Sequence, residues 1–165
     1  MVLQATKKLQ DFLGIKVISV PENIDSFSCW HANIFLLNRK KCLLITHNES
    51  LYTIFIYGVT KKDIPTLFEK IKKRISEQLR RDEFTLPQIA NILKTLESIE
   101  FAKTSDRSVT GNMNNMVQAI EIHSIYDDTT DEYLLANACN ETPYKRGKFY
   151  FPKKILRGLM KERLS

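Results

Sequence analysis

The sequence predicts an α+β fold in which an antiparallel sheet, built as a meander, packs against amphipathic helices and a helical C-terminal tail follows. Apolar, β-rich runs come first, as a block between residues 30 and 57, and helical periodicity begins at residue 61. Strands in one block and helices in the next favour segregated packing over βαβ alternation. We therefore expect three strands in residues 30–57, with a short strand over residues 99–103 extending the sheet.

Length and composition predict one globular unit. The chain has 165 residues, 43% hydrophobic and 27% charged, which is ordinary for a domain with its own core. We expect an α+β core over residues 1–125 and a basic helical extension over residues 126–165 that packs on it. No apolar run approaches the roughly 18 residues of a membrane span, so we expect a cytoplasmic protein with no membrane partner.

Metal and cofactor chemistry is not indicated. Cys29, Cys42 and Cys139 are odd in number and widely spaced, which favours neither a disulfide framework nor a zinc site. The chain also lacks a spaced histidine pair and a cluster of carboxylates of the kind that ligates metals. We therefore predict no metal and no cofactor.

The first half of the chain predicts one helix and then the meander. Thr6 followed by KKLQDFLG indicates a short helix that ends at Gly14. Three β-rich runs, WHANIFLL, CLLIT and LYTIFIY, are separated by the polar segments NRKK and HNES. The first turn gathers Arg39, Lys40 and Lys41 at one end of the sheet, where they either face solvent or contact a phosphate.

Two amphipathic helices are expected next, over residues 61–82 and 85–98. Apolar residues recur in both at steps of three and four, and Pro65 falls in the first turn, where proline is tolerated. The outer face of the first helix is basic. Its candidate nucleic-acid contacts are Lys72, Lys73, Arg80 and Arg81. These side chains either are solvated, as charged helix faces commonly are, or displace counterions from phosphates, and the concentration of the net charge of +6 here raises nucleic acid above background as a partner.

The densest run of functional groups is residues 101–116, FAKTSDRSVTGNMNNM. Apolar residues on both sides predict a loop between a strand and a helix that begins after Gly111, and its donors could converge on one anion. The candidate anion-binding residues are Thr104, Ser108, Gly111, Asn112 and Asn114, beside Lys103 and Arg107. We expect Arg107 to be at least partly buried, because a guanidinium between two apolar segments must have its five donors satisfied.

The tail is acidic at first and basic afterwards. Acidic residues from Asp127 to Glu132 are expected to cap and begin a helix. The segment KRGKFYF interleaves cations with aromatic rings, as surfaces for single-stranded nucleic acid do, although the same rings could equally dock the tail on the core. A last amphipathic helix is predicted after Pro152.

Four runs together resemble a bacterial family of small proteins of unknown function. They are a TKKL-like helix at residues 6–9, a tryptophan-led strand at residues 30–33, an RKKCLL-like strand at residues 39–44, and a KTxxRSVxGxMN motif at residues 103–114. The resemblance covers most of residues 5–123. It brings no activity with it.

Three functions are compatible with these patterns. The first is association with RNA or DNA, including a metal-independent, toxin-like ribonuclease in which Lys103 and Arg107 hold the scissile phosphate and His123 moves a proton. The second is a module that binds a phosphate-bearing small molecule at the same loop. The third is a structural or protein-interaction domain in which the basic faces are solvated. His123 is then only a half-buried helix residue.

Overall fold

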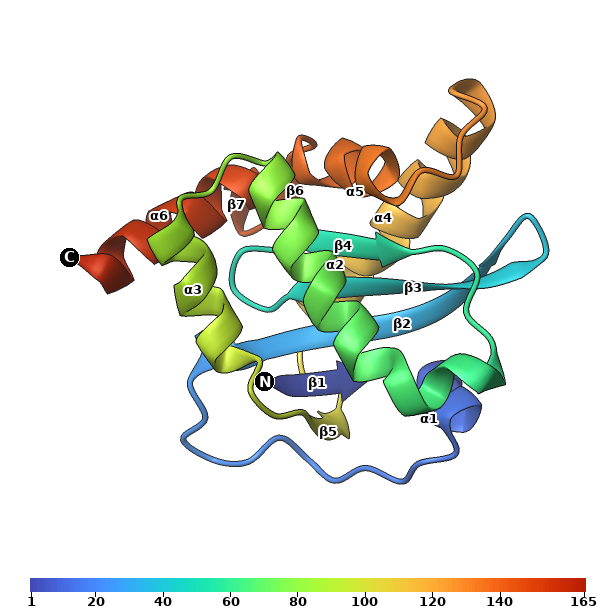
Figure 1. The fold of residues 1–165 in the computed structure, drawn as a ribbon, viewed down its shortest axis with the longest axis horizontal. Helices are drawn as coiled ribbons and strands as arrows, with labels where there is room; N and C mark the ends of the chain where they lie inside the picture. The colour runs from blue at the N-terminus through green and yellow to red at the C-terminus, as the bar shows by residue number, and fades with distance from the viewer.

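The computed structural model describes residues 1–165 and shows a sheet with helices on both faces (Figure 1). The sheet has five strands in the order β4-β3-β2-β1-β5. The strands are β1 (Val2–Ala5), β2 (Cys29–Leu37), β3 (Lys40–His47), β4 (Thr53–Ile56) and β5 (Glu100–Lys103). β2, β3 and β4 form the predicted antiparallel meander, and the strand expected at residues 99–103 is present as β5.

The prediction of a purely antiparallel sheet is wrong, because β1 runs parallel to both of its neighbours. Val2 pairs with Cys29 of β2 and with Glu100 of β5. The four residues of β1 are all buried and show no alternation. Their partners lie far away along the chain, so no local pattern identifies this strand. The protein is therefore α+β with a mixed sheet.

Two helical layers enclose the sheet. The first layer comprises α1 (Lys7–Leu13), α2 (Leu67–Arg81), α3 (Leu86–Thr95) and α6 (Pro152–Leu164). The second comprises α4 (Arg107–Tyr126) and α5 (Glu132–Asn140). Leu43 and Ile45 of β3 belong to the core shared with the first layer, whereas Cys42 and Leu44 pack in the core under α4 and α5. This alternation buries the central strand on both faces, as its nearly continuous apolar sequence predicts.

Two predicted helix boundaries differ in the structure. The helix expected over residues 61–82 is a 3-10 helix (Lys61–Thr66) followed by α2, and Pro65 lies at the junction, where it has no N–H to donate. The helix expected after Gly111 begins at Arg107, because Asp106 caps it there. Gly111 is therefore inside a helix, and more than half of the predicted loop is α-helical.

The C-terminal segment contributes to both cores. α5 places Leu135 and Cys139 in the core under the second layer, and α6 places Leu156 and Met160 in the other. Between these helices, β6 (Tyr144–Arg146) and β7 (Lys148–Tyr150) form a hairpin around Gly147, whose φ of 74° is in the left-handed region. No helix is both long enough and apolar enough to cross a membrane.

Candidate functional site

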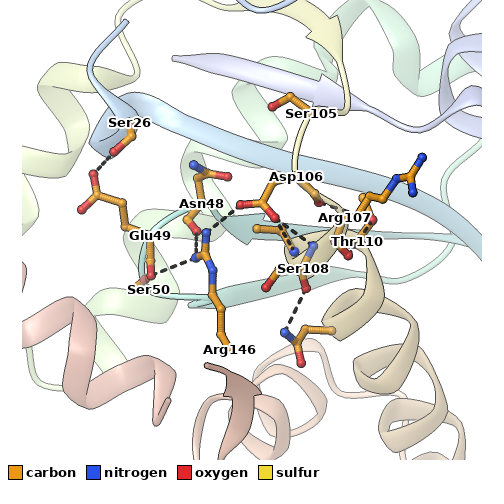
Figure 2. A network of polar contacts seen from close by, with 12 residues as sticks. Ser26, Asn48, Glu49, Ser50, Ser105, Asp106, Arg107, Ser108, Thr110 and Arg146 are labelled. Atoms are coloured by element: carbon orange, nitrogen blue, oxygen red, sulfur yellow. Dashed lines mark hydrogen bonds and ion pairs between the residues drawn. The ribbon is translucent and has the colours of Figure 1, made fainter. Parts of the chain in front are cut away.

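Asp106 is the centre of the polar groups that the sequence concentrates before α4 (Figure 2). Its Oδ1 accepts hydrogen bonds from the backbone N–H groups of Ser108, at 2.8 Å, and Val109, at 3.2 Å. Its Oδ2 accepts a bond of 2.7 Å from Nη2 of Arg146. A helix N-terminus and a guanidinium are the donors expected to converge on an anion. Here the anion that they bind is the protein's own carboxylate.

Arg146 connects this carboxylate to a third segment. Its Nη1 donates to the backbone carbonyl of Asn48 at 2.6 Å and lies 3.4 Å from that of Glu49, in the turn between β3 and β4. Asn112 Nδ2 donates to the Lys145 carbonyl at 3.2 Å, which joins α4 to β6 a second time. We call the contacts of Asp106 and Arg146 the Asp106–Arg146 junction. It fastens α4, the C-terminal hairpin and the β3–β4 turn together.

The prediction that Arg107 is partly buried is wrong. Arg107 is exposed, and Figure 2 shows its side chain directed away from the junction. As the first residue of α4 it lies on the same helical side as Gly111 and Gln118, which are also exposed. Arg146 is the guanidinium whose donors are satisfied internally. In the sequence, Arg146 stands only among the cations of the basic tail, in KRGKFYF.

The other predicted site residues do not form one centre. Lys103, Thr104, Ser108, Gly111 and Asn114 are exposed near the start of α4, whereas Asn112 is buried. His123 lies sixteen residues beyond Arg107, about 24 Å along a helix that rises about 1.5 Å per residue. Its Nδ1 is 3.2 Å from Asp127 Oδ2 instead.

Two buried histidines carry no local sequence signal. His31 is fully buried, neither ring nitrogen has a hydrogen-bond partner, and burial lowers its pKa to about 4, with opposing contributions from Asp106 and Arg146. His47 is also fully buried, with Nε2 2.9 Å from the Phe27 carbonyl and Nδ1 2.8 Å from Ser50 Oγ, and burial lowers its pKa to about 4. Both rings are therefore neutral at pH 7.

The basic residues of α2 do not gather on one surface. Lys72 and Arg81 are nine residues apart, which places them about half a turn out of phase on the helix. Lys73 is 3.9 Å from Glu77, and the Arg81 guanidinium lies 5.0 Å from the centre of the Tyr133 ring. Arg80 is exposed. Arg74, which the pattern places on the basic outer face, is buried and donates to Gln78 Oε1 at 2.7 Å.

The structure brings a different set of cations together, around the turn of the β2–β3 hairpin. Two adjoining cavities of about 810 Å³ and 510 Å³ share Phe12, Lys41 and Lys61 in their walls. We call the two together the basic groove. The cations that line it are Lys8, Arg39, Lys40, Lys41 and Lys61. None of the five forms an ion pair, and all five are exposed.

Local geometry positions these cations. Asn38 and Arg39 have φ values of 49° and 64°, the left-handed pair that a two-residue hairpin turn of type I′ requires. The ammonium groups of Lys41 and Lys61 lie 5.1 Å and 5.3 Å from the centre of the Phe12 ring, on α1. Lys40 lies 5.3 Å from the ring centre of Tyr57. Cation–π contacts of this kind orient a lysine without neutralising its charge.

The model of the family described as a domain of unknown function (DUF6933) matches residues 2–155. The chain belongs to this family. The matched region of the DUF6933 domain contains the whole sheet, α1 to α5 and the β6–β7 hairpin, so both the Asp106–Arg146 junction and the basic groove lie within it. A comparison with curated proteins gives no match.

Proposed function

We propose that this DUF6933 protein binds single-stranded nucleic acid in the basic groove. The observation that carries the proposal is the presence of five cationic side chains without acidic partners around one groove with aromatic walls. Neutralising a phosphate backbone releases condensed counterions, which favours binding to such a surface. Exposed ring surface beside the cations supplies a place for bases to stack. Phe35 and Tyr57, both partly exposed, are the rings available for this.

The proposal is for binding without cleavage. A general acid and base must lie within hydrogen-bond reach of the group they serve. Lys103 and Arg107 lie at one end of α4 and His123 lies near the other, so these three residues cannot act on one phosphate. The basic groove contains no histidine, and its two carboxylates, Asp11 and Glu121, are both in the larger cavity. The geometry therefore favours association over the ribonuclease hypothesis.

A phosphate-bearing small molecule is the competing ligand, because the larger cavity falls within the range of about 300 to 1,000 Å³ typical of small-molecule sites. The two ligands differ in how many cations they engage. An oligonucleotide spans both cavities and contacts several cations, whereas a mononucleotide occupies one. Binding of an oligonucleotide should consequently fall more steeply with salt, with a slope of about 0.7 per phosphate contact for a single strand.

Fluorescence anisotropy with short labelled single strands of RNA and DNA, and with duplex DNA, tests the proposal. Arg39→Glu combined with Lys40→Glu should weaken single-strand binding by about tenfold or more, because it reverses two cations of the groove. Lys73→Glu combined with Arg80→Glu is the matched control, since it changes net charge equally on exposed positions of α2. Circular dichroism melts verify that both variants fold.

Three results would overturn the proposal. One is the absence of single-strand binding at low salt. Another is an equal loss of affinity in the two variants, which would show that only net charge matters. The third is displacement of the oligonucleotide by stoichiometric ATP with no difference in salt dependence, which would identify the groove as a small-molecule site.

A further inference from the structure

The larger cavity of the basic groove lies against an open edge of β2. β1 pairs with β2 only as far as Ala32, whose carbonyl accepts a hydrogen bond of 3.0 Å from the Thr6 N–H group. After Thr6 the chain turns into α1, so no strand lies beside the rest of β2 on this side. Ile34 and Leu36 are in the cavity wall, and Leu36 is 60% exposed. The open edge therefore faces a space of about 810 Å³.

The register of β2 shows which backbone groups point toward this space. Alternate residues along a strand direct their N–H and C=O groups to the same edge. The Ala32 carbonyl points toward β1, whereas the Cys29 carbonyl points toward the β3 side, where it accepts from the Asn48 N–H group at 3.0 Å. Ile34 and Leu36 follow Ala32 by two and four residues, so their N–H and C=O groups point away from β3. The Ile34 carbonyl and the Leu36 N–H group are thus a neighbouring acceptor and donor without a strand partner.

Glu121 of α4 is the one carboxylate of the basic groove without a cationic partner. Asp11, the other acid in the walls, is 2.7 Å from the Lys7 ammonium group. Glu121 forms no ion pair, although lysines line the same cavity. A carboxylate in a phosphate-binding groove weakens binding, because like charges repel. It favours binding only when the ligand offers it a hydrogen-bond donor, and the exocyclic amine of a nucleobase is such a donor.

We infer that the larger cavity binds one base of the strand and selects a base that carries an exocyclic amine. This inference rests on the proposed binding of single strands in the basic groove. In cytosine, N4–H donates to the Ile34 carbonyl, N3 accepts from the Leu36 N–H group, and the second N4 hydrogen faces Glu121. Adenine offers the same order of groups at N6 and N1. When uracil bonds to the same two backbone groups, its remaining carbonyl faces Glu121 and is repelled.

The walls on either side of the open edge fit a flat ring. Phe12 belongs to α1 and Val117 to α4, so they line the cavity from opposite faces of the sheet. A ring in the plane of the sheet edge lies between these two side chains, and unstacked bases are held between side chains of this kind. The smaller cavity has cations and no acid in its walls, which suits phosphates. An extended peptide also pairs with strand edges, but its backbone carries no phosphates for these cations.

Fluorescence anisotropy with short labelled oligomers of cytidine and of uridine, at pH 7 and low salt, tests this inference. The two strands have the same backbone charge and ring size, and they differ only at the 4-position and N3 of the base. The cytidine strand should bind about tenfold more tightly, as one well-placed set of base contacts allows. Glu121→Gln should remove most of this difference, because an amide can donate to the uracil carbonyl. Asp11→Asn removes the same charge from the same cavity and should change both affinities equally.

Leu36→Pro is an independent test of the strand edge. It removes one N–H donor from the open edge and no hydrogen bond of the β2–β3 ladder, as proline on an edge strand can. It should weaken binding of the cytidine strand several-fold relative to Leu36→Ala, which retains the N–H group. Circular dichroism melts verify that each variant folds, and Glu121→Gln decides the question if proline unfolds the sheet.

The outcomes separate this inference from the proposed function. Equal affinity for the two strands, or a cytidine preference that Glu121→Gln leaves intact, would refute the base site while single strands still bind. A preference that Asp11→Asn abolishes as fully as Glu121→Gln would show that only the charge of the cavity matters, and would refute it too. Absence of binding to either strand would overturn the proposed function and this inference with it.

Discussion

Replacing Arg146 by lysine should destabilise the protein by about 2 kcal/mol, whereas the same replacement at Arg107 should change the free energy of unfolding by less than about 0.5 kcal/mol. Arg146 uses two nitrogens to bind Asp106 and the Asn48 carbonyl, at 2.7 Å and 2.6 Å. A lysine ammonium is one point and cannot reproduce this fork. Hydrogen bonds to charged groups contribute about 1.5 to 3 kcal/mol each. The two side chains are 22% and 29% exposed, so solvent screening lowers the sum.

Urea unfolding followed by circular dichroism at pH 7 measures both changes, and for a chain of this length about 2 kcal/mol corresponds to a melting temperature lower by about 4 to 8 °C. Asp106→Asn completes a double-mutant cycle with Arg146→Lys, because asparagine still caps a helix but carries no charge. We expect a coupling free energy of about 1 kcal/mol. Equal losses for Arg107→Lys and Arg146→Lys, or a coupling of zero, would show that the Asp106–Arg146 junction does not hold the three segments together.

Two further predictions concern buried polar groups. Burial lowers the pKa of His31 and of His47 from 6.5 to about 4. Between these two pH values the unfolded chain therefore binds more protons than the folded chain. The free energy of unfolding should fall by about 3 kcal/mol per histidine as the pH drops from 6.5 to about 4. Urea titrations at several pH values should show a shallower fall in His31→Leu, and an unchanged slope would contradict this assignment. Asp82→Ala should lower the free energy of unfolding in urea by about 3 to 5 kcal/mol. The buried Asp82 carboxylate accepts hydrogen bonds from Tyr52, at 2.5 Å, and from Tyr133, and it lies 3.0 Å from Lys153 of α6. Glu83→Ala, at the exposed neighbouring position, is the control. An equal loss of stability in Glu83→Ala would contradict the role assigned to the Asp82 carboxylate.

Features set by neighbouring residues could be predicted from the sequence. Gly14 ends α1 in the left-handed conformation, with φ of 68°, and Thr85 with Gln88 forms the capping box of α3. Both depend on groups within four residues of each other, so their signals are local. The meander of β2 to β4 was equally visible, since each of its turns connects adjacent strands.

The candidate site was predicted less well, because its contacts are not local. The segment before α4 was correctly identified as rich in hydrogen-bonding groups, but its guanidinium partner lies forty residues further on, at Arg146. The same sequence reads as a loop until Asp106 is recognised as the cap of α4. Nothing in the run around Arg107 indicates which of two arginines turns inward, since that depends on where β6 packs.

The sequence by itself determined the α+β class, the meander, most helices and the basic character of the chain. Only the tertiary structure decided the parallel pairing of β1, the Asp106–Arg146 junction and the basic groove. The groove takes its residues from α1, from the β2–β3 turn and from the segment around Lys61, which are joined only when the sheet forms. Local propensity acts over a few residues, whereas these three features come from packing between segments that lie tens of residues apart.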